Sequence, residues 1–212
     1  MASYGTTRNR AGKGATYGYK QQSDLIVQCA RKCFERKGVR KTTLVQIAHE
    51  ANMTRELIYY YFSGKDEIVQ CVFDLYVQDA METVRLWCDE WETKEGSCDD
   101  LGERLSREAI TDAVASMRRF LFKQNGERRP MFAVLDEMGE KRRFMRLTSE
   151  LVYQAVAESK LAGRVHALFP RLSDEEGPMA LKLVLMGVMG VMEGSNARDD
   201  AHIVDLLVGD TR

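Results

Sequence analysis

The chain has 212 residues, of which 44% are hydrophobic and 30% charged, enough for one large or two small domains with a buried core. It contains only three prolines, all at or after residue 130, and many helix-forming residues, which favours an all-α fold. No apolar run reaches the ~18 residues that span a bilayer, and the first residues are rich in Gly, Arg and Tyr, so we expect neither a membrane helix nor a secretory signal. The five cysteines are an odd number, and four fall within helical patterns, which favours a reduced, cytoplasmic protein.

Charge is unevenly distributed along the chain. Residues 1–65 contain twelve Lys or Arg and four acids, a net charge of +8, whereas the remaining 147 residues have a net charge of −9, which together give the overall −1. A phosphate backbone would attract the first segment and repel the second. Charge alone leaves open a basic, solvated surface without a nucleic-acid partner.

Residues 1–20 are expected to form a disordered basic arm. They include four glycines, four basic residues and no acid, so little apolar surface is available to offset the entropy of ordering the backbone. Such an arm could follow the minor groove of DNA. It could equally serve only as a solvating tail.

The first helix is expected at Ser23–Lys37, with Ser23 as its N-cap and Gly38 as its end. An apolar stripe at helical spacing would face a core: Leu25, Ile26, Cys29, Ala30, Cys33 and Phe34. Because Cys29 and Cys33 belong to this stripe, we expect small core residues there and not a metal or redox site.

A tight turn is expected to join two further short helices, Leu44–Ala51 and Arg55–Phe62. Thr43 and Thr54 precede them as N-caps. Asn52 occupies the turn, where a left-handed backbone conformation is needed, and Asn tolerates that conformation better than any residue except Gly. Two short helices in this arrangement are typical of a helix-turn-helix, whose second helix lies in the major groove of DNA.

The spacing TT-x3-IA-x2-A-x2-T-x3-IYYYF-x2-K over residues 42–65, preceded by CFERKGVRKTT, resembles the tetracycline-repressor (TetR) family of transcriptional regulators. The resemblance covers about residues 23–70. Two positions depart from the family pattern, since Asn52 replaces the usual turn glycine and Ile58 replaces a leucine. Both changes are conservative in backbone and volume. The resemblance implies a DNA-binding domain at residues 21–65 and a helical effector-binding and dimerisation domain at residues 66–212.

Six residues of the segment are expected to contact double-stranded DNA: Thr43, Thr54, Arg55, Tyr59, Tyr60 and Lys65. Thr43 lies at a helix N-terminus and could bind a phosphate. Tyr59 and Lys65 match family positions that contact the DNA backbone. The other three lie where a recognition helix meets base edges, and Arg55 could bind guanine in a bidentate manner. Tyr61 is expected in the core.

The remainder of the chain is expected to be helical, without strands, at about residues 66–91, 101–123, 131–138, 141–162, 178–193 and 200–208. Large side chains on the middle helices are candidates to line an effector pocket, although each is more often ordinary core: Tyr76, Trp87, Met117, Phe120, Phe144 and Tyr153. The helix Met179–Met192 is apolar on nearly every side and must be buried, either within the subunit or in a homodimer interface. The interface candidates are Leu181, Leu185, Val188, Met189 and Met192.

Nothing in the sequence indicates catalysis. The three histidines are far apart, and HExxH spacing, a Gly-rich phosphate loop and a GxSxG elbow are all missing from the sequence. We therefore expect no enzyme, no metal and no other cofactor. The resemblance favours a ligand-responsive repressor that binds a palindromic operator as a homodimer, with an unknown small-molecule effector. The alternative is a structural or partner-recruiting DNA-binding protein without an effector.

Overall fold

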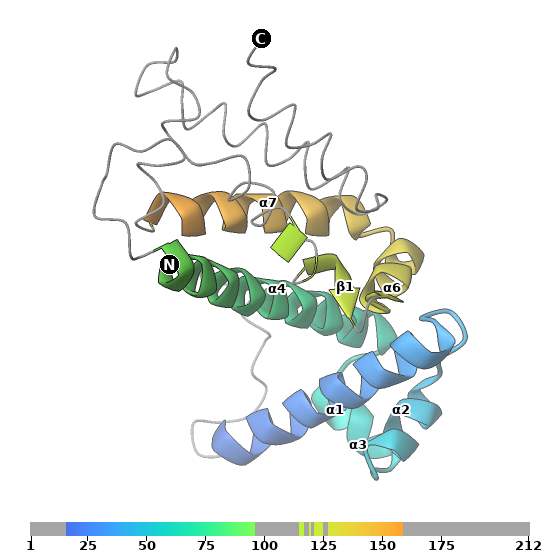
Figure 1. Ribbon diagram of the computed structural model, residues 1–212. Coiled ribbons are helices and arrows are strands. Elements are labelled where there is room, and N and C mark those ends of the chain that lie inside the picture. The colour runs from blue at the N-terminus through green and yellow to red at the C-terminus, as the bar shows by residue number, and fades with distance from the viewer. Residues whose placement is uncertain (1–15, 96–114, 117–118, 120, 125–126, 159–212) are drawn as a thin grey trace. The chain divides into compact units, whose positions relative to one another are not determined.

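The computed structural model describes residues 16–95, 115–116, 119, 121–124 and 127–158. Figure 1 shows its elements: α1 (Thr16–Lys37), α2 (Leu44–Glu50), α3 (Arg55–Tyr61), α4 (Lys65–Glu95), β1 (Lys123–Gln124), β2 (Glu127–Arg128), α6 (Met131–Met138) and α7 (Lys141–Glu158). The architecture is all-α, as the sequence predicts, apart from one short hairpin. The chain divides within α4 into two compact units, Met1–Asp74 and Leu75–Arg212. In the part that the structure describes, no helix is both long and apolar enough to cross a membrane.

The first unit is built on a small core between α1, α2, α3 and the start of α4. Ile26, Ile47, Ile58 and Ile68 are each fully buried, and Phe34 is nearly so. These residues recur at helical spacing within their own elements, so each helix has one apolar face. Burial of those faces stabilises helices of only seven residues, such as α2 and α3, that would not persist in isolation.

The first helix is longer than the sequence predicts. α1 begins at Thr16, seven residues before the expected start, so residues 16–20 of the expected disordered arm are helical. The Ser23 hydroxyl donates a hydrogen bond to the carbonyl of Lys20 at 2.9 Å, which places Ser23 inside the helix and not at its N-cap. The extra turns contact α3 through Tyr19, and this tertiary contact supplies the ordering that local sequence does not. Residues 1–15 of the expected arm lie outside the described residues.

The caps and turns of the helix-turn-helix confirm the sequence-based expectations. The hydroxyl oxygens of Thr43 and Thr54 accept hydrogen bonds from the backbone N–H groups three residues later. The Thr43 cap is a full capping box, because the Gln46 side chain accepts a hydrogen bond from the Thr43 N–H at 3.1 Å. Asn52 adopts a φ of 53°, and Gly38, which follows α1, adopts a φ of 84°. Both α2 and α3 end one residue earlier than expected.

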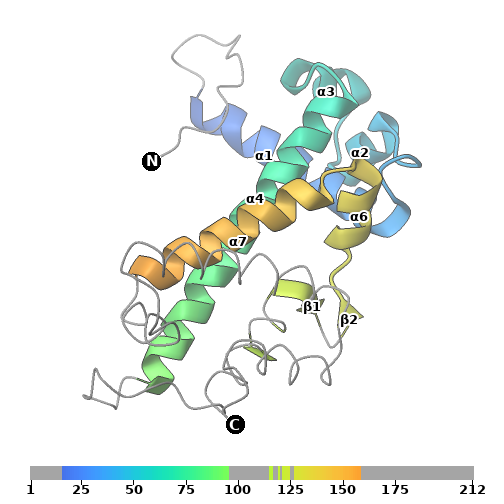
Figure 2. The ribbon, with the colours of Figure 1, turned by 90° about the horizontal axis from the view of Figure 1, so that it is seen from above.

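The second unit contains the later part of α4 together with β1, β2, α6 and α7. Two views show α7 lying along this part of α4 (Figures 1 and 2). The core between them includes Phe122, Phe132 and Phe144, whose rings form a stacked pair at 5.5 Å and an edge-to-face pair at 6.0 Å. Trp87 is buried in α4, and its indole N–H donates to the Ser116 hydroxyl at 2.8 Å.

Two features of this unit differ from the expectations. α4 continues to Glu95, beyond the expected end of the helix at about residue 91. The chain pairs as an antiparallel hairpin, Lys123 with Arg128 and Gln124 with Glu127, where the sequence predicted the end of a helix at about residue 123 and no strands. The Asn-Gly sequence between the two strands is a strong hairpin signal, which the helical pattern around it obscured. α6 has the expected bounds, and α7 begins as expected at Lys141.

Candidate functional site

The face of α3 opposite the core is open to solvent and largely apolar. Ile58 and Phe62 anchor the helix and its end in the core, whereas Leu57, Tyr59 and Tyr60 are 39%, 46% and 64% exposed. Large apolar side chains gathered on a surface mark an interaction site more often than a solvated face. Because the major groove of DNA admits an α-helix, this exposed face of the expected recognition helix is available for a contact with DNA.

Two expected DNA-contacting residues on this face interact with each other. The Arg55 guanidinium donates a hydrogen bond to the Tyr59 hydroxyl at 3.1 Å, and its central carbon lies 5.4 Å from the centroid of the Tyr59 ring. The hydrogen bond raises the pKa of Arg55 above its ordinary value, so the side chain remains a cation. A guanidinium has five N–H donors, and a single bond to a hydroxyl leaves donors for a base edge.

Lys65 stands in a different environment from the other five expected contact residues. It is the first residue of α4, it is half-buried, and its ammonium donates a hydrogen bond to the backbone carbonyl of Val39 in the loop between α1 and α2. An ammonium has three N–H donors. Lys65 therefore joins two parts of the first unit and still has donors for a phosphate.

Sequence reasoning missed Tyr19, which lies on α1 next to the recognition helix. The rings of Tyr19, Tyr60 and Tyr61 form a cluster, with centroid separations of 4.7 Å between Tyr19 and Tyr61, 5.0 Å between Tyr60 and Tyr61, and 5.9 Å between Tyr19 and Tyr60. Tyr61, which was expected in the core, is half-buried within this cluster. The signal was available, because Tyr19 lies seven residues before Ile26 on the apolar side of the helix.

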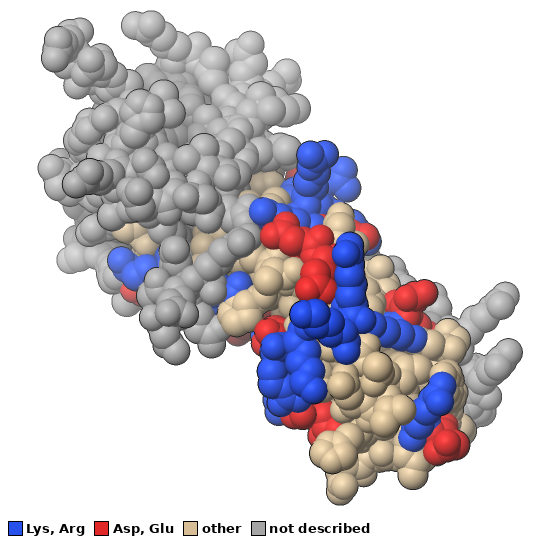
Figure 3. Space-filling view, turned by 90° about the vertical axis from the view of Figure 1, so that its right-hand side faces the viewer, with Lys and Arg blue, Asp and Glu red and all other residues tan. Residues whose placement is uncertain are grey.

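Basic side chains near the end of α1 are partly neutralised by acids. Arg31 pairs with Glu35 at 3.0 Å, and Arg36 pairs with Glu50 of α2 at 3.0 Å. The exposed basic residues of this region are Lys32, Arg36, Lys37, Arg40 and Lys41. Figure 3 shows Lys and Arg side chains on one face of the molecule with Asp and Glu side chains between them. The attraction to a polyanion is therefore smaller than the count of basic residues indicates.

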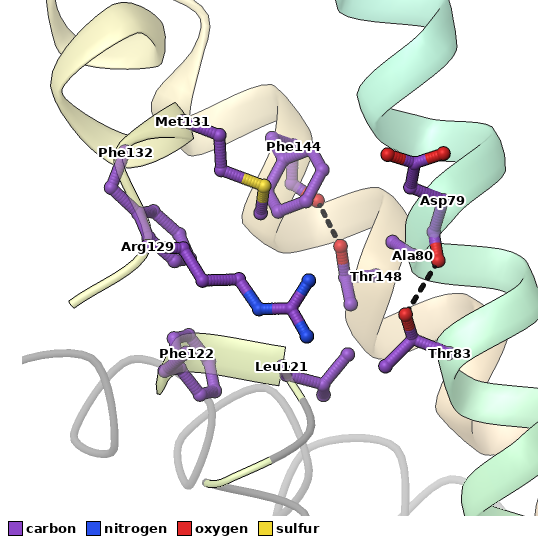
Figure 4. A pocket seen from close by; sticks show the side chains of 10 residues that line it. All are labelled: Asp79, Ala80, Thr83, Leu121, Phe122, Arg129, Met131, Phe132, Phe144 and Thr148. Carbon is purple, nitrogen blue, oxygen red and sulfur yellow. Dashed lines mark hydrogen bonds between the residues drawn. The ribbon is translucent and has the colours of Figure 1, made fainter. Parts of the chain in front are cut away.

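The second unit contains a narrow cavity, part of it open to solvent, whose interior has room for about one water molecule. Ten residues line it (Figure 4): Asp79, Ala80, Thr83, Leu121, Phe122, Arg129, Met131, Phe132, Phe144 and Thr148. The walls are mainly aromatic and aliphatic, and the Arg129 side chain extends into the middle of the space. The hydroxyls of Thr83 and Thr148 donate to carbonyls of their own helices at 2.7 and 2.9 Å, which leaves their oxygen lone pairs as acceptors.

The cavity includes one of the six residues expected to line an effector pocket. Phe144 lines it, whereas Tyr76 and Trp87 are buried in α4 and Tyr153 is half-buried on α7 without lining it. The expected lining residues Met117 and Phe120 lie outside the described residues. So do all five candidates for the dimer interface, Leu181, Leu185, Val188, Met189 and Met192.

The cysteines of the first unit are placed as core residues. The thiols of Cys29 and Cys33 are buried and donate to the carbonyls of Glu50 and Gln46, and burial raises the pKa of both. Burial also raises the pKa of Cys71 to about 11. Within the described ranges, no group of three or more His, Cys, Asp or Glu residues is arranged to hold a metal ion.

Comparison with known proteins agrees with the geometry of the first unit. Residues 26–72 match the family model described as bacterial regulatory proteins, tetR family. The chain is 43% identical over 49 residues to the HTH-type transcriptional regulator TtgR of Pseudomonas putida, covering 23% of each protein. It is 41% identical over 64 residues to the HTH-type transcriptional regulator HbdR of Aromatoleum sp. (strain CIB), covering 28% of each. These matches span only about a quarter of the relatives' own length.

Solved structures share the fold over most of the chain. RolR in complex with resorcinol aligns with a TM-score of 0.54 and 18% identity, covering 90% of this chain and 87% of that one. The TetR family repressor AlkX from Dietzia sp. strain DQ12-45-1b aligns with a TM-score of 0.51 and 12% identity, covering 88% and 92%. At such identities the likeness concerns the fold alone. The capped helix-turn-helix and the match over residues 26–72 show that this segment is similar to the DNA-binding segment of bacterial regulatory proteins of the tetR family.

Proposed function

We propose that this protein is a transcriptional regulator that binds a palindromic operator as a homodimer and releases it when a small molecule binds the second unit. The observation that carries the proposal is the exposed face of α3, on which Arg55, Tyr59 and Tyr60 stand on a helix held by a buried Ile58. Because the tetR-family match covers this segment, the exposed face is best explained as a base-reading surface.

The proposed contacts divide into base edges and phosphates. Arg55, with Tyr60 and Thr54 beside it, reads bases from the N-terminal part and outer face of α3. Thr43 at the start of α2, Tyr59 on α3 and Lys65 at the start of α4 bind the backbone, which fixes register without reading sequence. Two such helices in a dimer must lie about 34–36 Å apart to enter successive turns of one face of DNA. A change in that separation would release the operator.

The effector is proposed to bind the cavity in the second unit. Three phenylalanine rings line a small space into which Arg129 extends, a combination of apolar walls and few polar groups that is typical of ligand sites. RolR, which shares the fold, was solved with resorcinol. The lining residues of this chain favour a small planar molecule with one or two polar substituents, for which the narrow cavity would have to widen by movement of its side chains.

The test of DNA binding is selection from a randomised duplex library, followed by sequencing of the bound fraction. An enriched inverted repeat is the expected result. Arg55→Ala should relax the preference at one or two base positions, each worth about 1–3 kcal/mol. The matched control is Arg85→Ala, since Arg85 lies on α4 in the second unit and pairs with Glu82 and Asp89. Tight but unselective binding by the unmodified protein would favour the alternative of a structural DNA-binding protein.

A separate measurement tests the effector. The melting temperature and the affinity for the selected operator are followed while resorcinol and related small phenols and aromatic acids are titrated. A ligand of the cavity should raise the melting temperature and lower the affinity for the operator. Ala80→Met places a larger side chain in the lining and should abolish both effects while operator binding persists. Operator binding that no small molecule alters would support a regulator that responds to a protein partner.

A further inference from the structure

Tyr19 lies outside the helix-turn-helix and before the matched family segment, yet it contacts the recognition helix. Its ring centroid lies 4.7 Å from that of Tyr61 and 5.9 Å from that of Tyr60. Its hydroxyl donates a hydrogen bond to the carbonyl oxygen of Tyr61 at 3.4 Å. These contacts join residues more than forty positions apart, so they fix where the first turns of α1 lie relative to the end of α3.

The hydrogen bond from Tyr19 satisfies a group that α3 cannot satisfy itself. Tyr61 is the last residue of α3, and the final four carbonyls of a helix have no partner within it. The hydroxyl of Tyr19 is kept in its donor form, because burial and the neighbouring Tyr60 raise its pKa above the ordinary value. Tyr19 therefore braces the C-terminal end of the helix that carries the base-reading residues.

The ring contacts restrain Tyr60, which is otherwise 64% exposed. Tyr61 meets it in an edge-to-face arrangement at 5.0 Å with an interplanar angle of 89°, and Tyr19 meets it from another side at 65°. Pairs with this geometry are favourable beyond simple burial. A side chain held by two neighbours enters a groove with less loss of rotamer freedom than one that is free to rotate.

We propose that Tyr19 is a positioning residue for DNA recognition, which acts through Tyr60 to set the base preference of the recognition helix. The proposal rests on the proposed function, because it requires α3 to read DNA. Tyr19 need not touch a base itself. Its part is to hold the Tyr60 ring and the end of α3 in one arrangement.

The experiment compares base preferences from randomised duplex selections for the unmodified protein, Tyr60→Ala, Tyr19→Ala, Tyr19→Phe and the double variant Tyr19→Ala/Tyr60→Ala. Tyr19→Ala should weaken preference, by about 3- to 10-fold, at the same base positions that Tyr60→Ala affects. The double variant should show the profile of Tyr60→Ala alone, because the two residues act as one unit. Tyr19→Phe retains the ring and loses the hydrogen bond to Tyr61, so it should change the preference at the same positions by less than Tyr19→Ala. Leu25→Ala, at a 44% exposed position on the same helix, is the matched control.

Folding is checked by the melting temperature of each variant, and selections are run well below the lowest value. A general loss of affinity in Tyr19→Ala, equal for all sequences and without a change in base preference, would show a purely structural role and overturn the inference. So would a double variant whose changes in preference are the sum of the two single ones. If the unmodified protein enriches no sequence at all, the proposed function fails, and that outcome is distinct from the failure of the inference alone.

Discussion

Replacement of Lys65 by methionine separates two roles that one ammonium can have. Met retains the length of the side chain and removes the hydrogen bond to Val39. A bond from a charged donor contributes about 1.5–3 kcal/mol when buried, and Lys65 is only half-buried. The Val39 carbonyl also retains its bond from the Thr42 N–H at 3.2 Å. For these two reasons, we expect the free energy lost with this hydrogen bond to lie at the low end of that range or below it.

The position of Lys65 reduces the net cost further. It is the first residue of α4, where a cation interacts unfavourably with the helix dipole by about 0.3–1 kcal/mol. Met relieves that repulsion. We therefore expect Lys65→Met to lower the free energy of unfolding by about 1 kcal/mol, which corresponds to a fall in melting temperature of roughly 2–4 °C for a chain of this size.

Two assays are read together. Denaturant titration gives the free energy of unfolding, and operator affinity at several salt concentrations gives the slope of log affinity against log salt. Loss of one phosphate contact should reduce that slope by about 0.9 and weaken all sequences alike. Arg142→Met, at an exposed arginine of α7 in the second unit, is the control for removal of charge. An unchanged free energy of unfolding would refute the structural role, and a lower one with an unchanged slope would refute the phosphate contact.

Three further predictions concern the first unit. Thr42→Val should lower the free energy of unfolding by about 1–3 kcal/mol, measured by denaturant titration, because the buried Thr42 hydroxyl donates to the Gly38 carbonyl at 2.7 Å; Thr42→Ser should retain most of it. Asn52→Gly should leave the melting temperature unchanged or higher, whereas Asn52→Ala should cost roughly 1 kcal/mol, because φ is 53° at this position. Alkylation of Cys71, followed by mass spectrometry, should be slow at pH 8 and accelerate towards pH 11, since its pKa is about 11; rapid alkylation at pH 8 would contradict the raised pKa.

Local signals in the sequence were sufficient to predict the helix-turn-helix. A threonine before each short helix, an asparagine at the turn and a glycine after the first helix each specify a backbone conformation within a few residues. The structure has Thr43 and Thr54 as caps and Asn52 and Gly38 with positive φ. The ends of α2 and α3 differ from the expectation by one residue, which is the usual uncertainty of a helix terminus.

Contacts between residues distant in sequence account for most of what sequence reasoning missed. The first turns of α1 are helical and contact α3 through Tyr19, although their composition alone predicts a disordered segment. The hydrogen bond between Lys65 and Val39 joins residues 26 positions apart, so no local sequence pattern predicts it. The β1–β2 hairpin is different, because its Asn-Gly signal was local and was outweighed by helix-forming neighbours.

The cavity could not have been predicted residue by residue. Its walls come from α4, α6, α7 and the segment around the β1–β2 hairpin, and which side chains converge depends on how these elements pack. A large side chain on a middle helix is as well suited to fill a core as to line a pocket. The sequence predicted that both Phe144 and Trp87 line a pocket. Phe144 does line the cavity, whereas Trp87 is buried and its indole N–H donates to Ser116.

In the first unit, most of the residues that attract DNA by charge are different from the residues that are proposed to read its bases. α3 itself, with the sequence RELIYYY, contains one arginine and one glutamate, so the recognition helix has no net charge. The positive charge that attracts phosphates lies on α1 and the loop after it, at residues such as Lys37, Arg40 and Lys41. Counterion release acts on those residues and is the same for every DNA sequence. The affinity for any duplex should therefore fall steeply with salt, whereas the ratio between operator and random DNA should change much less, because Arg55 is the one cation among the residues proposed to read bases.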